Sequence, residues 1–336
     1  MINRYYLLDI SRGIAALIVV IFHYRIFYHE PISDSLFNID QSPFSNYLYI
    51  FYKNGWLAVQ FFFILSGFIF YELYLEKIRS KKISFKNFFV LRFSRLYPLH
   101  LITLLITVIM IFFFDIFNVK SFNIEADIYH FFLNIFLIHY WGFEQYQSFN
   151  EPSWSISIEI MCYLIFFIIF SFRLNKFFIT ICLLIISGVI YKFNVFISYG
   201  LYCFFMGGMT NLIFKKIDTT KFLNIFFILF LISLVVLYQV NNSIFEKIIL
   251  LTICLPLVII IFASIQKKNK DIGKKLKFLG DISYSIYLNH FVLQLMVHLF
   301  LSILNLKVNF NSEIIFIFYI IFIILSSSFT YYYIEN

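Results

Sequence analysis

The sequence predicts an all-α, polytopic integral membrane protein of about ten transmembrane helices, with both termini in the cytoplasm. Hydrophobic residues make up 62% of its 336 residues and charged residues 13%, whereas soluble domains are about half apolar and about a quarter charged. Apolar runs of about 20 residues, the length that crosses a bilayer as a helix, recur along the chain. This composition excludes a soluble domain, a disordered chain, a disulfide scaffold and a nucleic-acid-binding module.

The apolar runs define the expected spans in chain order. They are residues 7–27, 56–75, 96–117, 154–172, 177–191, 196–214, 222–240, 245–265, 280–303 and 312–333, of which 177–191 is the shortest. A further stretch, 128–141, is marginal because it carries His130, Asn134 and His139. We expect it to be an interfacial or re-entrant piece on the outer side.

The basic loops determine the expected topology. Segment 77–95 carries seven Lys or Arg and segment 266–277 carries six, and the shorter basic loops are 173–176 and 215–221. If 128–141 does not span, all four lie on the cytoplasmic side, as positively charged loops do. Then 20 of the 26 basic residues are inside and six outside. The net charge of +8 therefore reflects topology.

We expect a single membrane domain over residues 1–336 with no appended soluble domain. The four cysteines lie inside apolar segments, where buried cysteine acts as a small hydrophobic residue. Their spacing suggests no metal site.

Polar residues inside the first two spans are candidate functional groups, because such residues are costly in a bilayer. Arg12 and His23 are 11 residues apart, about 20° past three full helical turns, so they share one face. Ser66 and Gly67 lie near the middle of the second span. The alternatives are a snorkelling arginine, an interfacial histidine and a small pair used for helix packing.

Two arginines follow in the loop after the second span. Arg92 and Arg95 are three residues apart and would share a helical face, from which two guanidinium groups can fork onto phosphates. The alternative is an ordinary positive-inside loop.

The fourth and ninth spans also carry polar groups. Glu159 lies about one and a half turns into the segment 154–172, where an unpaired carboxylate would be expensive, so we expect a partner or a wet cavity. Ser155 and Ser157 precede it, and Asn289 and His290 lie in the middle of 280–303. A polar contact between helices is the alternative for Asn289 and His290.

Taken together, these motifs resemble the acyltransferase 3 family of bacterial membrane proteins. The matching positions are Arg12, His23, Phe62, Phe63, Ser66, Gly67, Arg92, Arg95, Trp154, Ser155, Ser157, Glu159, Leu279, Gly280, Ser283, Tyr284, Ser285, Tyr287, Leu288 and His290, with YYYIEN at the close. Ile160 stands where the family commonly has a second acidic residue. We expect no hydrolase-like domain to follow, in which case acceptor transfer would finish in this domain or on a separate partner.

The resemblance implies a multi-pass bacterial inner-membrane O-acyltransferase. Its donor would be a cytoplasmic acyl-CoA, usually acetyl-CoA as a co-substrate with no permanently bound cofactor. Its acceptor would be a hydroxyl of a cell-surface or lipid-linked glycan. The phosphates of the donor would bind to Arg12, Arg92 and Arg95. Its pantetheine arm would pass the level of Ser66 and Gly67.

His23 and Glu159 would be the catalytic pair. His23 would act as a general base on the sugar hydroxyl or carry a transient acyl group, and the sequence leaves both open. Helical rise places the two residues about 6 Å and about 7–8 Å below the outer ends of their spans, which suggests that they meet. Ser155, Ser157, Asn289 and His290 would form a polar core.

Other functions also place charges inside a membrane domain. A transporter or flippase for a glycan or lipid intermediate predicts inverted repeats and paired broken helices, and the sequence shows neither. A glycan polymerase would favour a large charged outer loop, and none of the expected outer loops is large. A non-catalytic scaffold would gain nothing to offset the free energy needed to place Arg, Glu and His side chains inside the membrane.

The topology makes the first prediction. Cysteines introduced at positions 40, 82 and 270 should react differently with an impermeant thiol reagent added outside whole cells, because only segment 28–55 is expected to be external. Position 40 should be labelled, and positions 82 and 270 should react only after the cells are opened. Labelling of position 82 in intact cells would contradict this topology.

Overall fold

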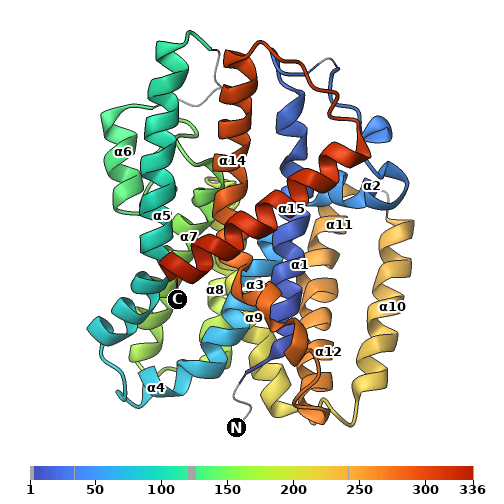
Figure 1. The fold of residues 1–336 in the computed structure, drawn as a ribbon. Helices are drawn as coiled ribbons and strands as arrows, with labels where there is room; N and C mark the ends of the chain where they lie inside the picture. The colour runs from blue at the N-terminus through green and yellow to red at the C-terminus, as the bar shows by residue number, and fades with distance from the viewer. Residues whose placement is uncertain (1–3, 34, 120–125, 241, 336) are drawn as a thin grey trace. The chain divides into compact units, whose positions relative to one another are not determined.

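The computed structural model describes residues 4–33, 35–119, 126–240 and 242–335, and helices account for most of these residues (Figure 1). The chain divides into two compact units, each built from three stretches of sequence. Unit 1 consists of Met1–Arg12, Val59–Phe89 and Ile158–Gly280, and unit 2 of Gly13–Ala58, Val90–Ser157 and Asp281–Asn336. The expected single domain is not tested by this division, and each unit is described by itself.

Unit 1 is formed mainly by the middle of the chain. Its helices are α3 (Leu57–Leu73, from Val59), α4 (Leu75–Arg79), α7 (Trp154–Ser171, from Ile158), α8 (Lys176–Ile190), α9 (Val195–Lys216), α10 (Leu223–Gln239), α11 (Ser243–Ile249), the π-helix η4 (Leu250–Cys254), α12 (Leu255–Lys268), η5 (Lys274–Leu276) and α13 (Lys277–Asp281). Helices α8 and α9 pack against each other as an antiparallel pair joined by a short turn.

Unit 2 combines the start, one middle segment and the end of the chain. Its helices are most of α1 (Tyr6–His23), η1 (Tyr24–Tyr28), η2 (Ile39–Gln41), α2 (Ser45–Asn54), most of α5 (Phe85–Ile116), α6 (Ile128–Ile135), η3 (Glu151–Ser153), α14 (Ser283–Ile303), α15 (Glu313–Thr330) and the π-helix η6 (Tyr331–Glu335). Ile26, Phe114 and Leu295 bring η1, α5 and α14 into one buried apolar cluster.

Every expected span coincides with a helix. Within the described residues, seven helical segments are long and apolar enough to cross a membrane, or eight if the bent pair α2–α3 counts as one span. Helices α8 and α10 are apolar but shorter. The protein is therefore an all-helical membrane protein, while the count of ten spans and the cytoplasmic termini stay predictions. Helix α6 has eight residues and is about 12 Å long, too short to span, as expected for 128–141.

Two expected loops are partly helical. Helix α5 begins at Phe85, so Arg92 and Arg95 lie on a helix rather than in a loop. The signal missed is Ser84, whose hydroxyl oxygen accepts a hydrogen bond from the Asn87 N–H at 3.2 Å, as an N-cap residue does. Residues 45–54, expected in an outer loop, form α2, and the chain bends by 64° between α2 and α3.

The segment around α6 is held by one carboxylate. Asp127 caps the helix by accepting the His130 backbone N–H at 2.9 Å, and it also bonds the His130 ring and the Tyr146 hydroxyl. These hydrogen bonds, that of Tyr146 first, hold the pKa of Asp127 well below its ordinary value. Nε2 of His130 accepts the Gln145 N–H at 3.2 Å, which ties the following loop to the helix.

Glycines let α3 and α9 approach until their backbones touch. A Cβ added to Gly67 would lie 1.8 Å from the Phe204 carbonyl oxygen, and one added to Gly207 would lie 1.8 Å from the Ile64 carbonyl oxygen. Small residues allow such close crossings in membranes, where helices associate by packing rather than by the hydrophobic effect. The contact fixes the position of Ser66, the neighbour of Gly67.

This crossing makes the second prediction. Gly67→Ala should lower the stability of the purified protein by about 1–3 kcal/mol, because the added methyl group meets rigid backbone. Gly188→Ala is the matched control, because Gly188 lies in α8 and a methyl group added there would have no neighbouring atom within 4 Å. Thermal unfolding in one detergent should show a lower midpoint for Gly67→Ala only. Equal midpoints for the two variants would contradict the packing role.

Candidate active site

The intramembrane carboxylate of unit 1 has its partners on two helices. Oε1 of Glu159 on α7 accepts a hydrogen bond from the Ser66 hydroxyl on α3 at 2.8 Å, and a second, very short one from the Tyr163 hydroxyl. Glu159 and Ser66 are each partly exposed. The expectation that this carboxylate needs a partner is confirmed, and the site joins two of the predicted residues, Ser66 and Glu159.

Gly67 has a different neighbourhood from Ser66. Its open side is filled by the backbone of Phe204, which leaves no space beside the glycine for a ligand. In the structure, Gly67 is therefore a packing residue that lets α3 carry Ser66 toward α7. A direct contact of Gly67 with a donor stays a prediction from the sequence.

Arg12 lies near the start of α1 in unit 1. Its Nη1 is 3.5 Å from Oδ1 of Asp9, whose other oxygen bonds Arg4 at 2.5 Å. Asp9 lies in the first turn, where a carboxylate is favoured by the helix dipole. Two guanidinium groups thus share one carboxylate.

Unit 2 brings two histidines together. Nε2 of His290 on α14 lies 3.0 Å from Nδ1 of His23 at the end of α1, and the two rings are nearly parallel, with an interplanar angle of 17° and their centroids 5.0 Å apart. Nδ1 of His290 lies 3.3 Å from the Ile286 carbonyl oxygen. Gln294 donates to the His23 carbonyl oxygen at 2.9 Å. His290 is fully buried, whereas His23 keeps part of its surface exposed.

These contacts determine the tautomers of both rings. A carbonyl oxygen only accepts hydrogen bonds, so Nδ1 of His290 carries the proton that bonds Ile286. In a neutral imidazole the other nitrogen is then an acceptor, and Nδ1 of His23 must donate to it. Nε2 of neutral His23 is left unprotonated, with a lone pair that can take a proton.

The other predicted polar residues of unit 2 connect helices to one another. The Ser155 and Tyr287 hydroxyls are 2.8 Å apart and link α7 to α14. The Ser157 hydroxyl oxygen accepts the Tyr140 backbone N–H at 3.1 Å. Asn289 donates to the Thr330 hydroxyl at 2.8 Å and links α14 to α15.

The stretch of α5 that carries Arg95 lies near two other parts of unit 2. The Tyr284 hydroxyl donates to the Leu96 carbonyl oxygen at 2.6 Å, one residue after Arg95. Glu335 near the end of the chain bonds Ser285 and is acted on by the charge of Arg95. Because α5 is helical here, Arg92 and Arg95 share a face, as their spacing predicts.

Sequence reasoning missed several partners. Tyr163 and Gln294 follow Glu159 and His290 by four residues, so a search of the same helical face for a donor would have found them. The other missed contacts are those of Tyr287 with Ser155, of Thr330 with Asn289, and of the Ile286 backbone carbonyl with His290. The sequence gives no sign of these contacts, although Tyr287 is one of the motif positions. Over the described ranges, no group of three His, Cys, Asp or Glu side chains is placed to hold a metal ion.

Comparison with known proteins identifies the family. The family model described as an acyltransferase domain matches residues 5–333, nearly the whole chain. The chain belongs to the acyltransferase 3 family. This confirms the resemblance indicated by the motifs.

The relatives match over about a third of the chain. Acyltransferase MdmB of Streptomyces mycarofaciens is 34% identical over 114 residues, which are 33% of this chain and 27% of the relative. Peptidoglycan O-acetyltransferase OatA of Listeria monocytogenes is 29% identical over 119 residues, 34% of this chain and 19% of the relative. The matches thus cover well under half of these proteins. No solved structure matches the chain.

The Glu159 contacts make the third prediction. Ser66→Ala and Glu159→Met should each destabilise the protein, since methionine has no oxygen acceptor, and together they should cost less than the sum, because the hydrogen bond they share is lost only once. The coupling energy from unfolding of the two single variants and the double variant should be about 0.5–3 kcal/mol. Ser171→Ala is the control, since the Ser171 hydroxyl donates to a carbonyl of its own helix and it should not couple to Glu159. Strict additivity of Ser66 and Glu159 would contradict the pair.

Proposed function

We propose that this member of the acyltransferase 3 family is a bacterial inner-membrane O-acyltransferase. It transfers an acyl group, acetyl in the first instance, from a cytoplasmic acyl-CoA to a hydroxyl of a cell-surface or lipid-linked glycan. The Listeria relative, which is named a peptidoglycan O-acetyltransferase, supports this acceptor class. The observation that carries the proposal is the His23–His290 pair, which leaves a histidine base with its Nε2 lone pair unused by either bond.

In the proposed reaction, Nε2 of His23 removes the proton from a sugar hydroxyl. The oxygen attacks the thioester carbonyl carbon, a C–O bond forms, and the C–S bond breaks. The proton held by His23 passes to the departing thiolate, so the histidine is neutral again. In the second form, Nε2 attacks the thioester carbonyl carbon, an N–C bond forms, and the C–S bond breaks to release the CoA thiolate. The sugar hydroxyl oxygen then attacks the acyl carbon, the N–C bond breaks, and the hydroxyl proton passes to the thiolate, so that His23 is neutral again.

His290 is the proposed positioning residue of this base. By accepting the Nδ1 proton of His23, it fixes the tautomer and offers a second ring that can share positive charge when His23 becomes protonated. The sequence assigned the orienting role to Glu159. Because Nδ1 of His23 already has a partner, a carboxylate would have to reach Nε2, and a direct His23–Glu159 contact stays a prediction.

The donor is proposed to bind through its phosphates at the basic helix ends. Arg12, Arg92 and Arg95 supply guanidinium forks suited to phosphate, and Ser66 lies at the level proposed for the pantetheine arm. Gly67 allows α3 to approach α9 and so to carry Ser66 at this level.

The function can be tested on purified protein in proteoliposomes. Isotope-labelled acetyl-CoA is added on one side, and the products are analysed by mass spectrometry with either a peptidoglycan fragment or a lipid-linked sugar as acceptor. Surface glycans of cells with and without the protein are compared in parallel. O-acylated sugar that depends on the protein supports the proposal. Movement of the sugar lipid across the membrane without acylation would support a flippase instead.

The histidine pair makes the fourth prediction. His23→Ala should reduce transfer by about 100- to 10,000-fold, the usual contribution of a general base. His290→Phe should lower kcat by about five- to tenfold with KM unchanged, because one hydrogen bond that fixes the base is lost. His290→Gln, which restores an acceptor, should recover most of that loss. Full activity of His23→Ala would refute the mechanism, and equal activity of the two His290 variants would refute the tautomer role.

The arginines of α5 make the fifth prediction. Arg92→Ala should weaken acyl-CoA binding, and Arg92→Lys should restore it only in part, since lysine lacks the planar fork. Arg25→Ala is the control, because Arg25 lies in η1, beyond the C-terminal end of α1, with its guanidinium over the Phe22 ring. Binding is measured by calorimetry with a non-hydrolysable acyl-CoA. Unchanged affinity in Arg92→Ala and in Arg95→Ala would refute the donor assignment.

A further inference from the structure

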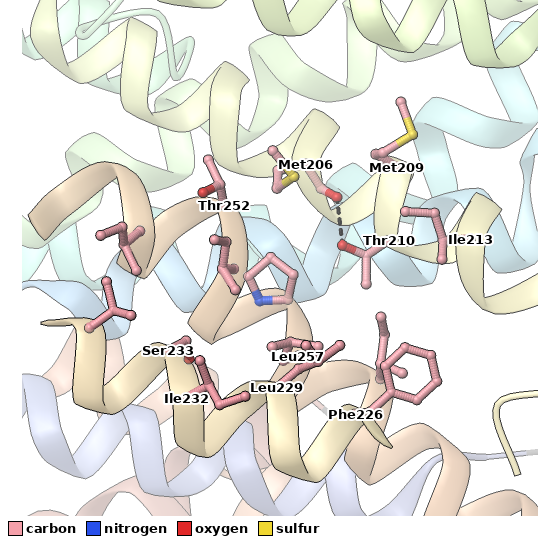
Figure 2. A pocket seen from close by; sticks show the side chains of 15 residues that line it. Met206, Met209, Thr210, Ile213, Phe226, Leu229, Ile232, Ser233, Thr252 and Leu257 are labelled. Carbon is pink, nitrogen blue, oxygen red and sulfur yellow. Dashed lines mark hydrogen bonds between the residues drawn. The ribbon is translucent and has the colours of Figure 1, made fainter. Parts of the chain in front are cut away.

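Unit 1 contains an apolar cavity that no step of the proposed reaction uses. It lies between α9, α10, η4 and α12 and has a volume of about 390 Å³ (Figure 2), within the range of about 300–1,000 Å³ found for ligand sites. Its walls include Met206, Met209, Phe226, Leu229 and Pro256. Helices α9 and α10 each pack against α12 and η4, and the cavity lies between these contacts.

The three hydroxyls in the wall are bonded to their own helices. Thr210 donates to the Met206 carbonyl oxygen at 2.8 Å, the bond drawn in Figure 2. Thr252 donates to the Ile248 carbonyl oxygen at 2.6 Å, and Ser233 to the Phe230 carbonyl oxygen at 2.6 Å. None of these donors is left for a polar ligand, and water needs two or more polar partners to occupy such a space. The walls therefore favour a hydrocarbon occupant.

Lysines surround one end of the cavity. Ile213 and Phe226 line it, and Lys216 follows Ile213 by one helical turn on α9, with its Nζ 5.7 Å from the centroid of the Phe177 ring. Lys221 lies in the turn that joins α9 to α10, shortly before Phe226. Lys267 at the end of α12 joins them, because its Nζ lies 4.6 Å from the centroid of the Phe214 ring.

The charge at this end is positive. Lys268 adds to it, Lys215 is paired with Glu72, and Asp218 is an acidic group near Lys267. A basic group at the end of a bundle of membrane helices attracts anionic lipid headgroups.

We propose that this cavity binds one acyl chain of an anionic glycerophospholipid. The headgroup lies at the lysine cluster of Lys216, Lys221 and Lys267, which the positive-inside pattern assigns to the inner leaflet. From Phe226 to Val236 the wall runs about 15 Å along α10, long enough for much of a lipid chain. The lipid fills the space between α9 and α10 and thereby holds α10 on the bundle.

The test uses the full-length protein in nanodiscs of phosphatidylglycerol and phosphatidylethanolamine with identical chains in equal amounts. After transfer to mild detergent, native mass spectrometry identifies the lipids that stay bound. The wild type should retain one phosphatidylglycerol, preferred over phosphatidylethanolamine by about fivefold or more, the ratio that the attraction of one lysine provides. Retention of no lipid, of an isoprenoid phosphate or without headgroup preference would overturn the proposal.

Two sets of variants separate the cavity from the charges. Thr252→Phe fills the cavity from η4 and should abolish retention, whereas Val235→Phe, on the exposed part of α10 outside the wall, should not. Lys216→Gln, Lys221→Gln and Lys267→Gln combined should keep a lipid and lose the preference for phosphatidylglycerol. The control variant removes the same number of positive charges elsewhere and combines Lys81→Gln, Lys82→Gln and Lys192→Gln. Equal retention by the two Phe variants would overturn the proposal.

A third measurement needs no variant that could misfold. Phosphatidylglycerol with a photoreactive group in its acyl chain is incorporated with the wild type, irradiated and located by peptide mapping. Cross-links should concentrate on the wall residues between Met206 and Ile260 rather than on the exposed face of α10. An even distribution over α10 would show ordinary lipid contact and overturn the proposal.

Discussion

A polar side chain inside a bilayer has no water to bond with, and this constraint shapes both units. Glu159 is stable in α7 because Ser66 and Tyr163 donate to it. Asn289 crosses from α14 to α15 to reach Thr330. Each such bond fixes the distance and rotation of two helices more strictly than apolar packing does, because the alternative is an unsatisfied group in hydrocarbon.

Close backbone contact supplies the second level of order. Gly67 and Gly207 let α3 and α9 touch, and this contact positions the neighbouring Ser66 for its bond to Glu159. The two adjacent motif residues therefore have different tasks, since one packs against a backbone and the other bonds a carboxylate. A substitution at Gly67 would disturb the carboxylate without contacting it.

The helices could be predicted from the sequence because a bilayer demands long apolar runs, which are plain to see. The ends of the helices were harder to predict from the sequence. Helix α5 extends back to Phe85 because Ser84 caps it, and the charges of that segment looked like a loop. Helix α2 is amphipathic and lies in a stretch with too few apolar residues to stand out. Local signals of this kind set boundaries and carry little weight in a hydropathy scan.

The candidate site was predictable as a set of residues but not as a set of contacts. Because a polar side chain in the membrane costs free energy, Glu159, His23 and His290 stand out as candidates from the sequence alone. Which of them pair depends on helix neighbours far apart in the chain: the bond between His23 and His290 spans 267 positions. Partners one turn away, such as Tyr163, are within reach of a helical-face argument but do not stand out, because tyrosine is common here, with 24 copies.

The histidine pair shows why the geometry adds chemistry to the motif. A neutral histidine alone at the end of α1 could carry its proton on either ring nitrogen. Only the tautomer protonated on Nδ1 leaves a lone pair on Nε2, the atom proposed to act as the base. The bond from His290 to the Ile286 carbonyl removes that freedom in two steps, first for His290 and then for His23. The backbone of α14 thus dictates which nitrogen of a residue on α1 carries the lone pair. In the proposed mechanism His23 therefore needs no carboxylate at Nδ1, and Glu159 keeps its bonds to Ser66 and Tyr163.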